Sequence, residues 1–178
     1  MTDKGEPLRL HIGGEAAKPG WKILNVQPNP GVDYIGDCCD LGVFPDGTVD
    51  EIYASHVLEH LGYADELPRA LLEFHRVLKK GGKASISVPD FDLLCRLFLE
   101  AQQNLTDRIL VMRMIFGGQT DRYDFHYVGL SFDILRTLLE EVGFSPVERV
   151  KEFGLFNDTS AMTFHGSLIS LNLIAHKR

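Results

Sequence analysis

The segment from Val49 to Val88 limits the possible folds more than any other part of the sequence. It begins with a mostly apolar run, Val49–Ser55, after the turn residues Pro45-Asp46-Gly47. A second apolar run, Lys83–Val88, ends at a proline. Between them, apolar residues recur at helical spacing: Leu67, Ala70, Leu71, Phe74, Val77 and Leu78. A strand, a helix and a strand in this order predict a parallel crossover unit.

The ends of this helix follow from residue types. Asp65 is of a type that caps a helix N-terminus, so the helix is expected to start there. The run Lys79-Lys80-Gly81-Gly82 combines positive charge with glycine and is expected to end it. The predicted helix therefore spans Asp65 to Leu78.

The rest of the chain continues the alternation of strands and helices. Further strands are predicted at Leu8–Ile12, Ile23–Val26, Tyr34–Gly36, Val147–Val150 and Leu168–Ala175. Further helices are predicted from Phe91 to about Gln102, from Thr106 to about Met114 and from Ser131 to Val142, capped by Asp90, Thr106 and Ser131. We expect a mostly parallel sheet covered by helices, in a single domain over residues 1–178.

The connection after the first strand is too short for a crossover helix. Only eight residues separate Ile12 from Trp21, whereas such a crossover needs at least about 10–12 residues. A loop or a single turn is therefore expected here.

Charge and cysteine content narrow the functional classes. The net charge of −7 argues against a dedicated nucleic-acid binder, which must neutralise phosphates. The three cysteines form no C-x-x-C pair and are expected to be reduced. No apolar run is long enough to cross a membrane, and Met1–Pro7 has no apolar stretch typical of a secretory signal. A cytoplasmic protein is the expectation.

Small and polar residues stand at the ends of the predicted strands. They are Gly13-Gly14-Glu15, Gln27, Asp37-Cys38, Ser55-His56 and Pro89-Asp90. Ligands of an open parallel sheet bind beyond the carboxyl ends of its strands. These residues are therefore the candidate binding site, although Asp37 could equally cap a turn and Cys38 could be a small core residue.

Two motifs resemble a known family. Val49–Leu61 reads V-D-E-I-Y-A-S-H-V-L-E-H-L, and Glu73–Lys83 reads E-F-H-R-V-L-K-K-G-G-K. Together with the strand ends they resemble class I S-adenosylmethionine (SAM)-dependent methyltransferases, in particular a small bacterial branch, over about Leu8–Val150. The resemblance implies a Rossmann-like three-layer fold, a seven-stranded sheet with an antiparallel last strand, SAM as cofactor, and methyl transfer.

The resemblance also assigns roles to individual residues. Gly13, Gly14 and Glu15 would lie at the SAM amino-acid portion, Gln27 at the ribose, Asp37 and Cys38 near the adenine, and Ser55 and His56 beside the sulfonium. Two positions depart from the family pattern: Glu15 replaces a glycine, and Gln27 replaces an acid. A side chain at Glu15 could obstruct the ligand, and Gln27 lacks the charge that strengthens a hydrogen bond to ribose. The alternative is an interaction module with a degraded cofactor site.

The loop Gly117–Gly129 is the candidate acceptor site. Tyr123, Asp124 and Tyr127 are the predicted substrate contacts, and His126 and His60 are the candidate general bases. The loop could instead act as a lid or as a partner contact. The expected partner is a small-molecule or protein methyl acceptor, with neither nucleic acid nor membrane expected and homodimerisation left open.

Two further segments allow alternatives. Lys151–Gly166 is long for its position, which suggests a flap over the site, a dimer contact, or a loop packed on its own domain. His56-Val57-Leu58-Glu59-His60 fits the H-x-x-E-H zinc motif of a hydrolase, which needs both histidines on one helix face. A strand precedes this motif and Gly62 follows it, so we assign no metal ligand.

Overall fold

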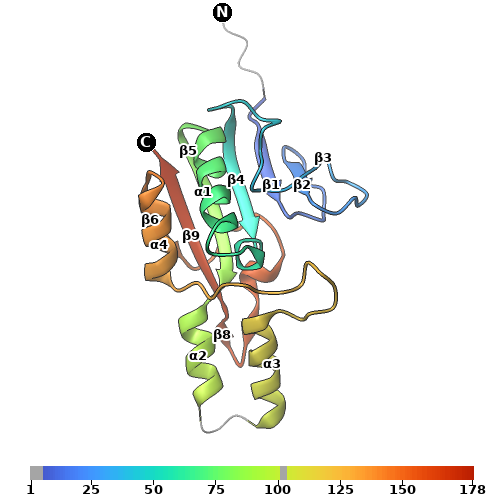
Figure 1. Cartoon of the computed structure of the whole chain (residues 1–178), viewed down its shortest axis with the longest axis vertical. Helices are drawn as coiled ribbons and strands as arrows, with labels where there is room; N and C mark the ends of the chain where they lie inside the picture. Colours follow the sequence, from blue (N-terminus) through green and yellow to red (C-terminus); the bar gives the residue numbers. More distant parts are fainter. Residues whose placement is uncertain (1–5, 101–103) are drawn as a thin grey trace, which may run out of the picture.

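A single seven-stranded sheet organises the protein. The computed structural model describes residues 6–100 and 104–178. The strands are β1 (Arg9–Ile12), β2 (Lys22–Asn25), β3 (Tyr34–Ile35), β4 (Val49–Ser55), β5 (Leu78–Pro89), β6 (Phe144–Val150) and β9 (Ser170–Lys177). They lie in the order β3-β2-β1-β4-β5-β9-β6 (Figure 1). The first five strands in this order, β3, β2, β1, β4 and β5, pair in parallel, and β9 is antiparallel to both β5 and β6. The predicted mostly parallel sheet with an antiparallel last strand is confirmed.

Four helices accompany the sheet within the described residues. They are α1 (Glu66–Val77), α2 (Phe91–Leu99), α3 (Leu105–Phe116) and α4 (Phe132–Glu141). Short turns of 3₁₀ helix are η1 (Leu58–His60) and η2 (Thr159–Ala161), and β7 (Thr163–Phe164) with β8 (Ser167–Leu168) forms a small hairpin. None of the helices in the described residues combines the length and hydropathy needed to cross a bilayer.

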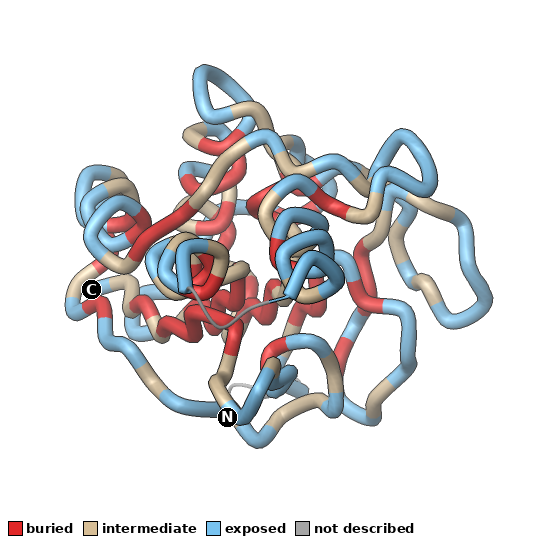
Figure 2. Tube along the Cα trace, turned by 90° about the horizontal axis from the view of Figure 1, so that it is seen from below, coloured by how far each residue is buried: buried red, intermediate tan, exposed pale blue. Residues whose placement is uncertain are grey.

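The main core lies between α1, α4 and one face of the sheet. Phe74 of α1 and Leu135 of α4 are fully buried there together with Ile52 and Ile86 from the central strands. Figure 2 shows the buried positions concentrated along the strands and on the inner sides of the helices. Removing this much apolar surface from water is the main source of stability for such a domain.

The opposite face of the sheet is covered differently. Residues 151–166, the return segment, bring Phe153 and Phe156 against Tyr53 of β4, with ring centroids 5.5 and 4.6 Å away. The Tyr53 hydroxyl donates to Asp158 Oδ2 at 2.8 Å. Of the three alternatives for this segment, a flap, a dimer contact or a loop packed on its own domain, the structure shows the last.

The first three strands are joined by loops. The chain after β1 makes no helix before Trp21, as the short spacing predicts. Side chains hold these loops: Asp33 Oδ2 accepts the Ile23 N–H at 2.9 Å, and Asn25 Nδ2 donates to the Gly14 carbonyl at 3.1 Å. Side-chain hydrogen bonds thus support backbone that no crossover helix covers.

Helices α2 and α3 form an arm beyond the carboxyl end of β5 (Figure 1). Asp90 caps α2 by accepting the Leu93 N–H at 3.1 Å, as predicted. The cap of α3 is Asn104, whose Oδ1 accepts the Asp107 N–H at 2.9 Å, so the prediction of Thr106 is wrong. Thr106 is the second residue of the helix, and the side chain of Asn104, two residues earlier, already occupies the capping position. The sequence predicts that α2 reaches about Gln102, but α2 ends at Leu99 with Glu100 as its C-cap. Residues 101 and 102 lie outside the described residues.

The two ends of α1 also differ from expectation. Asp65 occupies the N-cap position, but its side chain makes no cap hydrogen bond and lies 3.3 Å from Arg69 instead. The helix ends at Val77, because Leu78 already pairs with Val49 as the first residue of β5. Ser131 caps α4 as predicted, with the Ile134 N–H 3.4 Å from its Oγ.

Candidate functional site

A cavity of about 530 Å³ lies at the carboxyl ends of β1, β2 and β4. Most of the predicted strand-end residues line it. The remainder comes from the end of β2, the segment between β4 and α1, the start of α1 and the loop before α4. The lining residues are Gly13, Asn25, Val26, Gln27, Asp37, Cys38, His56, Val57, His60, Leu61, Gly62, Glu66, Arg122, Tyr123 and Tyr127. Its volume lies within the usual range for small-molecule sites.

The end of β1 requires glycine. Gly13 has φ of +72°, and a Cβ there would lie 2.6 Å from Val57 Cγ2. Gly14 is equally restricted, since a Cβ would come within 2.6 Å of the His11 ring. Glu15 is exposed and is not among the residues that line the cavity. The glutamate that departs from the family pattern therefore leaves the cavity open.

The ends of β2 and β3 supply polar groups. The Gln27 N–H donates to Asn25 Oδ1 at 2.9 Å, which orders the turn that carries Gln27 into the cavity. Asp37 Oδ1 accepts the Cys39 N–H at 2.8 Å, so Asp37 holds a turn and lines the cavity at once. Cys38 is buried; its contact with Cys39 and its burial raise the pKa of the thiol.

The end of β4 places His56 in a strained backbone conformation. Its φ is +54°, a region that residues other than glycine rarely adopt. The ring is held from both sides, with Nε2 3.0 Å from Ser170 Oγ and Nδ1 3.0 Å from Glu59 Oε1. Ser55, predicted beside it, does not line the cavity, and its buried Oγ forms no hydrogen bond within the described residues.

Glu59 is a buried carboxylate beside two further imidazoles. Only 1% of Glu59 is exposed. Burial opposes its ionisation, but the close contact with His56 and the nearby His60 outweigh it and lower the carboxyl pKa. The rings of His60 and His126 lie 4.8 Å apart, centroid to centroid. Both predicted bases are thus brought together, and burial lowers the pKa of His126.

The loop before α4 is ordered by one acid. Asp124 accepts hydrogen bonds from Thr120 Oγ1 at 2.7 Å and from the Gly118 N–H at 3.3 Å. These contacts occupy Asp124 within the loop, and it lines neither of the two cavities described in this section. Tyr123 and Tyr127, the other predicted substrate contacts, both line the first cavity.

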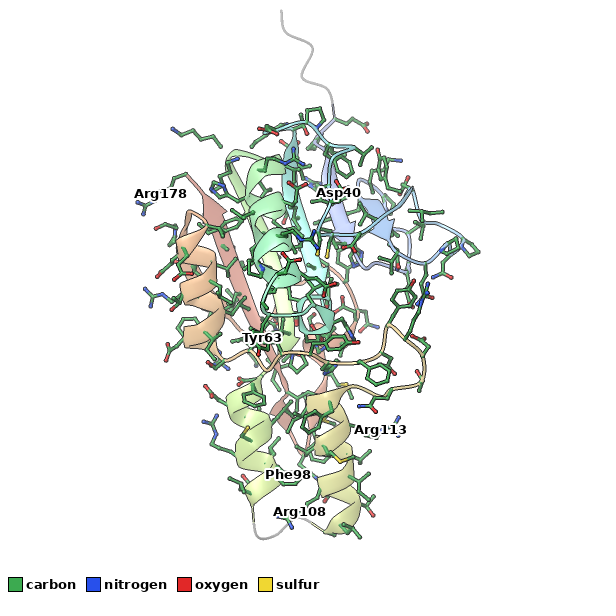
Figure 3. The ribbon with its side chains drawn as sticks, in the orientation of Figure 1. Asp40, Tyr63, Phe98, Arg108, Arg113 and Arg178 are labelled. Carbon is green, nitrogen blue, oxygen red and sulfur yellow. The ribbon has the colours of Figure 1, made fainter. Side chains whose placement is uncertain are left out.

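A second cavity of about 400 Å³ adjoins the first at Tyr127, which lines both. It lies between α2, α3 and the loop before α4, and its walls are almost entirely carbon. The lining residues are Phe91, Cys95, Phe98, Met112, Ile115, Phe116, His126, Tyr127, Val128 and Gly129. Figure 3 shows the side chains between the two helices of the arm, with Phe98 labelled on α2.

The helix that a zinc hydrolase needs at its H-x-x-E-H motif is not formed by this segment. Residues 58–60 form a single 3₁₀ turn, and His56 precedes it at the end of β4. The ring nitrogens of His56 are directed to Ser170 and Glu59 rather than to a site shared with His60.

Among the polar residues that line the first cavity, sequence reasoning missed Asn25, Glu66 and Arg122. Asn25 is the last residue of β2, two positions before Gln27, so its place at a strand end is the signal that could have identified it. Glu66 and Arg122 reach the cavity from a helix start and a distant loop. Their placement depends on tertiary packing.

Comparison with known proteins bears on this arrangement. Residues 17–86 match the model of a family described as a methyltransferase domain. No curated protein matches the sequence.

Several solved structures share the fold. A SAM-dependent methyltransferase from Thermotoga maritima, named a possible histamine N-methyltransferase, superposes with a TM-score of 0.61 at 18% identity, covering 97% of this chain and 83% of that one. The 1,6-didemethyltoxoflavin-N1-methyltransferase of Burkholderia thailandensis, solved with its substrate and S-adenosylhomocysteine, gives a TM-score of 0.60 at 15% identity, covering 97% and 72%.

A third neighbour is longer. A protein of Bordetella parapertussis named a possible exported protein gives a TM-score of 0.58 at 14% identity. The match covers 95% of this chain but only 61% of that protein.

Proposed function

We propose that this chain, which has the fold of the class I SAM-dependent methyltransferases, transfers a methyl group from SAM to a small-molecule acceptor with an apolar body. The supporting observation is the pair of adjoining cavities. One lies at the strand ends with glycine, amide and carboxylate groups, and the other is apolar. The proposal takes residues 1–178 as one cytoplasmic methyltransferase domain.

In the first cavity the strand ends would hold the cofactor. Gly13 would allow the SAM amino-acid portion to approach the backbone, and the Gln27 amide would bond the ribose hydroxyls. Asp37 and Cys38 would lie at the adenine, and His56 at the sulfonium. Gln27 can donate and accept hydrogen bonds, which compensates in part for the missing charge of an acid.

In the second cavity the apolar body of the acceptor would pack against α2 and α3. Its nucleophilic atom would then reach past Tyr127 toward the methyl group. The acceptor atom forms a bond to the methyl carbon, the sulfur–carbon bond breaks, and the electron pair stays on sulfur. Alignment alone can lower such a barrier by about 7–11 kcal/mol in favourable cases.

A hydroxyl or amine acceptor also loses a proton. His60 Nδ1 lies 3.1 Å from the Phe125 carbonyl, and His126 Nδ1 lies 3.0 Å from the Met114 carbonyl. Because a carbonyl can only accept, each Nδ1 carries the hydrogen, and each Nε2 has a free lone pair. These nitrogens are the proposed proton acceptors.

The first experiment is thermal unfolding with and without S-adenosylhomocysteine, followed by calorimetric titration. Saturation at about 100 times Kd should add about 2.7 kcal/mol to the folded state. No binding at millimolar ligand would contradict the proposal and support an interaction module with a degraded cofactor site.

The acceptor half needs its own variant. Cys95→Phe would fill the apolar cavity, and it should abolish methyl transfer to an apolar-bodied acceptor while S-adenosylhomocysteine still binds. The matched control is Leu99→Phe on the same helix, at a residue 74% exposed and outside the cavity lining. Equal activity of the two variants would exclude this cavity as the acceptor site.

A further inference from the structure

The two imidazoles at the junction of the cavities form a cluster with a buried carboxylate that has no part in the proposed methyl transfer. Ligand atoms of Glu59, His60 and His126 all lie within 4.8 Å of one another. His60 lines the first cavity and His126 the second. The cluster therefore borders both spaces at once.

Burying Glu59 needs a partner that the described residues supply only in part. The side chain is 1% exposed, and its Oε1 has His56 Nδ1 at 3.0 Å. Neither Oε1 nor Oε2 forms a hydrogen bond of good geometry within the described residues. A buried carboxylate oxygen without a donor is costly, unless a cation or another donor meets it.

The histidines are prepared as ligands by their hydrogen bonds. Each of them donates Nδ1–H to a backbone carbonyl, that of Phe125 for His60 and that of Met114 for His126. Metal-binding histidines usually make such a bond, because it fixes the ring and the tautomer. The unprotonated Nε2 of each ring is then the ligand nitrogen. His56 restrains the Glu59 carboxylate, because its Nδ1 lies beside one of the two carboxylate oxygens.

We propose that Glu59, His60 and His126 bind one divalent transition-metal ion of the Zn²⁺ type. Two imidazole nitrogens and one carboxylate form a common ligand set for such ions, and three protein ligands leave a coordination position open. Ligands at about 2.0–2.1 Å from a tetrahedral zinc are roughly 3.4 Å apart. Small side-chain rotations would bring the three groups to that spacing.

The location gives the ion a role that rests on the proposed function. An ion at the junction would hold an acceptor oxygen in its open position and lower the pKa of that hydroxyl. His60 and His126 would then be ligands rather than proton acceptors. This arrangement differs from the H-x-x-E-H hydrolase motif, because His56 is not a ligand and His126 comes from a distant loop.

The test is metal binding by the full chain after chelator treatment, with Zn²⁺ and Co²⁺ as the probes and no SAM present. We expect one ion per chain by equilibrium dialysis with elemental analysis. Co²⁺ should give visible absorption bands of a four- or five-coordinate nitrogen–oxygen site. His126→Gln and Glu59→Gln should each weaken binding at least about tenfold.

The matched control is His165→Gln, at an exposed imidazole outside the cluster that should leave binding unchanged. His60→Gln is a second ligand variant in case His126→Gln does not fold. Binding that survives both histidine changes would overturn the proposal, as would no binding at 1 mM ion. Sulfur-to-cobalt charge-transfer bands that disappear in Cys39→Ser would also overturn the proposal. They would place the ion at the other cluster, which is formed by Asp37, Cys38 and Cys39.

The same metal-free protein should be titrated with S-adenosylhomocysteine. If the cofactor binds and the metal does not, only the metal site is rejected, and the proposed methyl transfer stands. If neither binds, both proposals fail independently.

Discussion

The two halves of the sheet are built by different means. Strands β4 and β5 have 7 and 12 residues and are joined by the amphipathic helix α1. Strands β1, β2 and β3 have 4, 4 and 2 residues and are joined by loops. A helix-covered core stabilises the half that contains β4 and β5. Glycine turns, short polar contacts and the aromatic return segment stabilise the half that contains β1, β2 and β3.

This difference indicates which half of the sheet can present groups to a ligand. A packed helix–strand interface tolerates little change in shape. Loops that end short strands can present backbone and polar groups to a ligand, at the expense of local stability. The loop-joined half accordingly supplies Asn25, Gln27 and Asp37 to the polar lining of the cavity at the strand ends. The following predictions test the comparison, beginning with the largest effect.

Core deletion in the helix-covered half should be the most damaging change. Phe74 is fully buried in α1, and Phe74→Ala should lower the free energy of unfolding by about 3–5 kcal/mol, through lost burial and the cavity left behind. Urea unfolding measures it. Leu72→Ala, at a residue 54% exposed on the same helix, should cost less than about 0.5 kcal/mol. Similar losses for both variants would mean that α1 is not a core helix.

Lowering the pH should destabilise the half that contains β1, because the buried His11 ring resists protonation. This imidazole packs between Tyr53 and Phe156, and burial lowers its pKa to about 4, with Asp158 opposing in part. The unfolded state, with a pKa near 6.5, binds the proton first as the pH falls. Stability is therefore lost between about pH 6.5 and 4, by up to about 3 kcal/mol.

The variant His11→Gln should remove this part of the pH dependence. Its stability relative to the wild type should improve as the pH falls from 7 to 5, measured by urea unfolding at both values. A difference that stays constant with pH would show that His11 has the same pKa in the folded and unfolded states.

The first glycine turn joins stability to binding. Gly13→Ala places a Cβ at φ of +72° and against Val57, so we expect a loss of about 2 kcal/mol and much weaker S-adenosylhomocysteine binding. Gly154→Ala has a similar φ of +65° but nothing within 4 Å, and should cost about 1 kcal/mol without affecting binding. Unchanged binding in Gly13→Ala would place the ligand elsewhere.

The smallest effect is expected from a single loop contact. Asn25→Ala removes the hydrogen bonds to the Gly14 carbonyl and from the Gln27 N–H, and should cost about 1 kcal/mol. It should also weaken S-adenosylhomocysteine binding several-fold, as measured by calorimetry. The exposed Asn29→Ala on the same loop is the control, and equal effects would show that Asn25 has no special ordering role.

Local patterns were sufficient for much of the fold. The alternation and spacing in Val49–Ser55 and in the α1 segment predicted a strand with those bounds and a helix within one residue at each end. The short distance from Ile12 to Trp21 predicted the loop after β1. These features depend on interactions between residues close in the chain, which a sequence displays directly.

Features that depend on competition between neighbours were harder to predict. Thr106 and Asn104 are both capping residue types, and only the position of the helix in the arm selects Asn104. Ser55 and His56 are adjacent, yet alternation along β4 and the turn at its end bring only His56 to the cavity.

By itself the sequence determined the strand ends that form the first cavity, because each is marked by a change from apolar to small or polar residues. Only the tertiary structure brought His126 to Glu59 and His60, joined the apolar cavity of the arm to the strand ends, and laid the return segment over Tyr53. These contacts join residues more than sixty positions apart. Their geometry follows from how the elements pack, which local residue patterns do not encode.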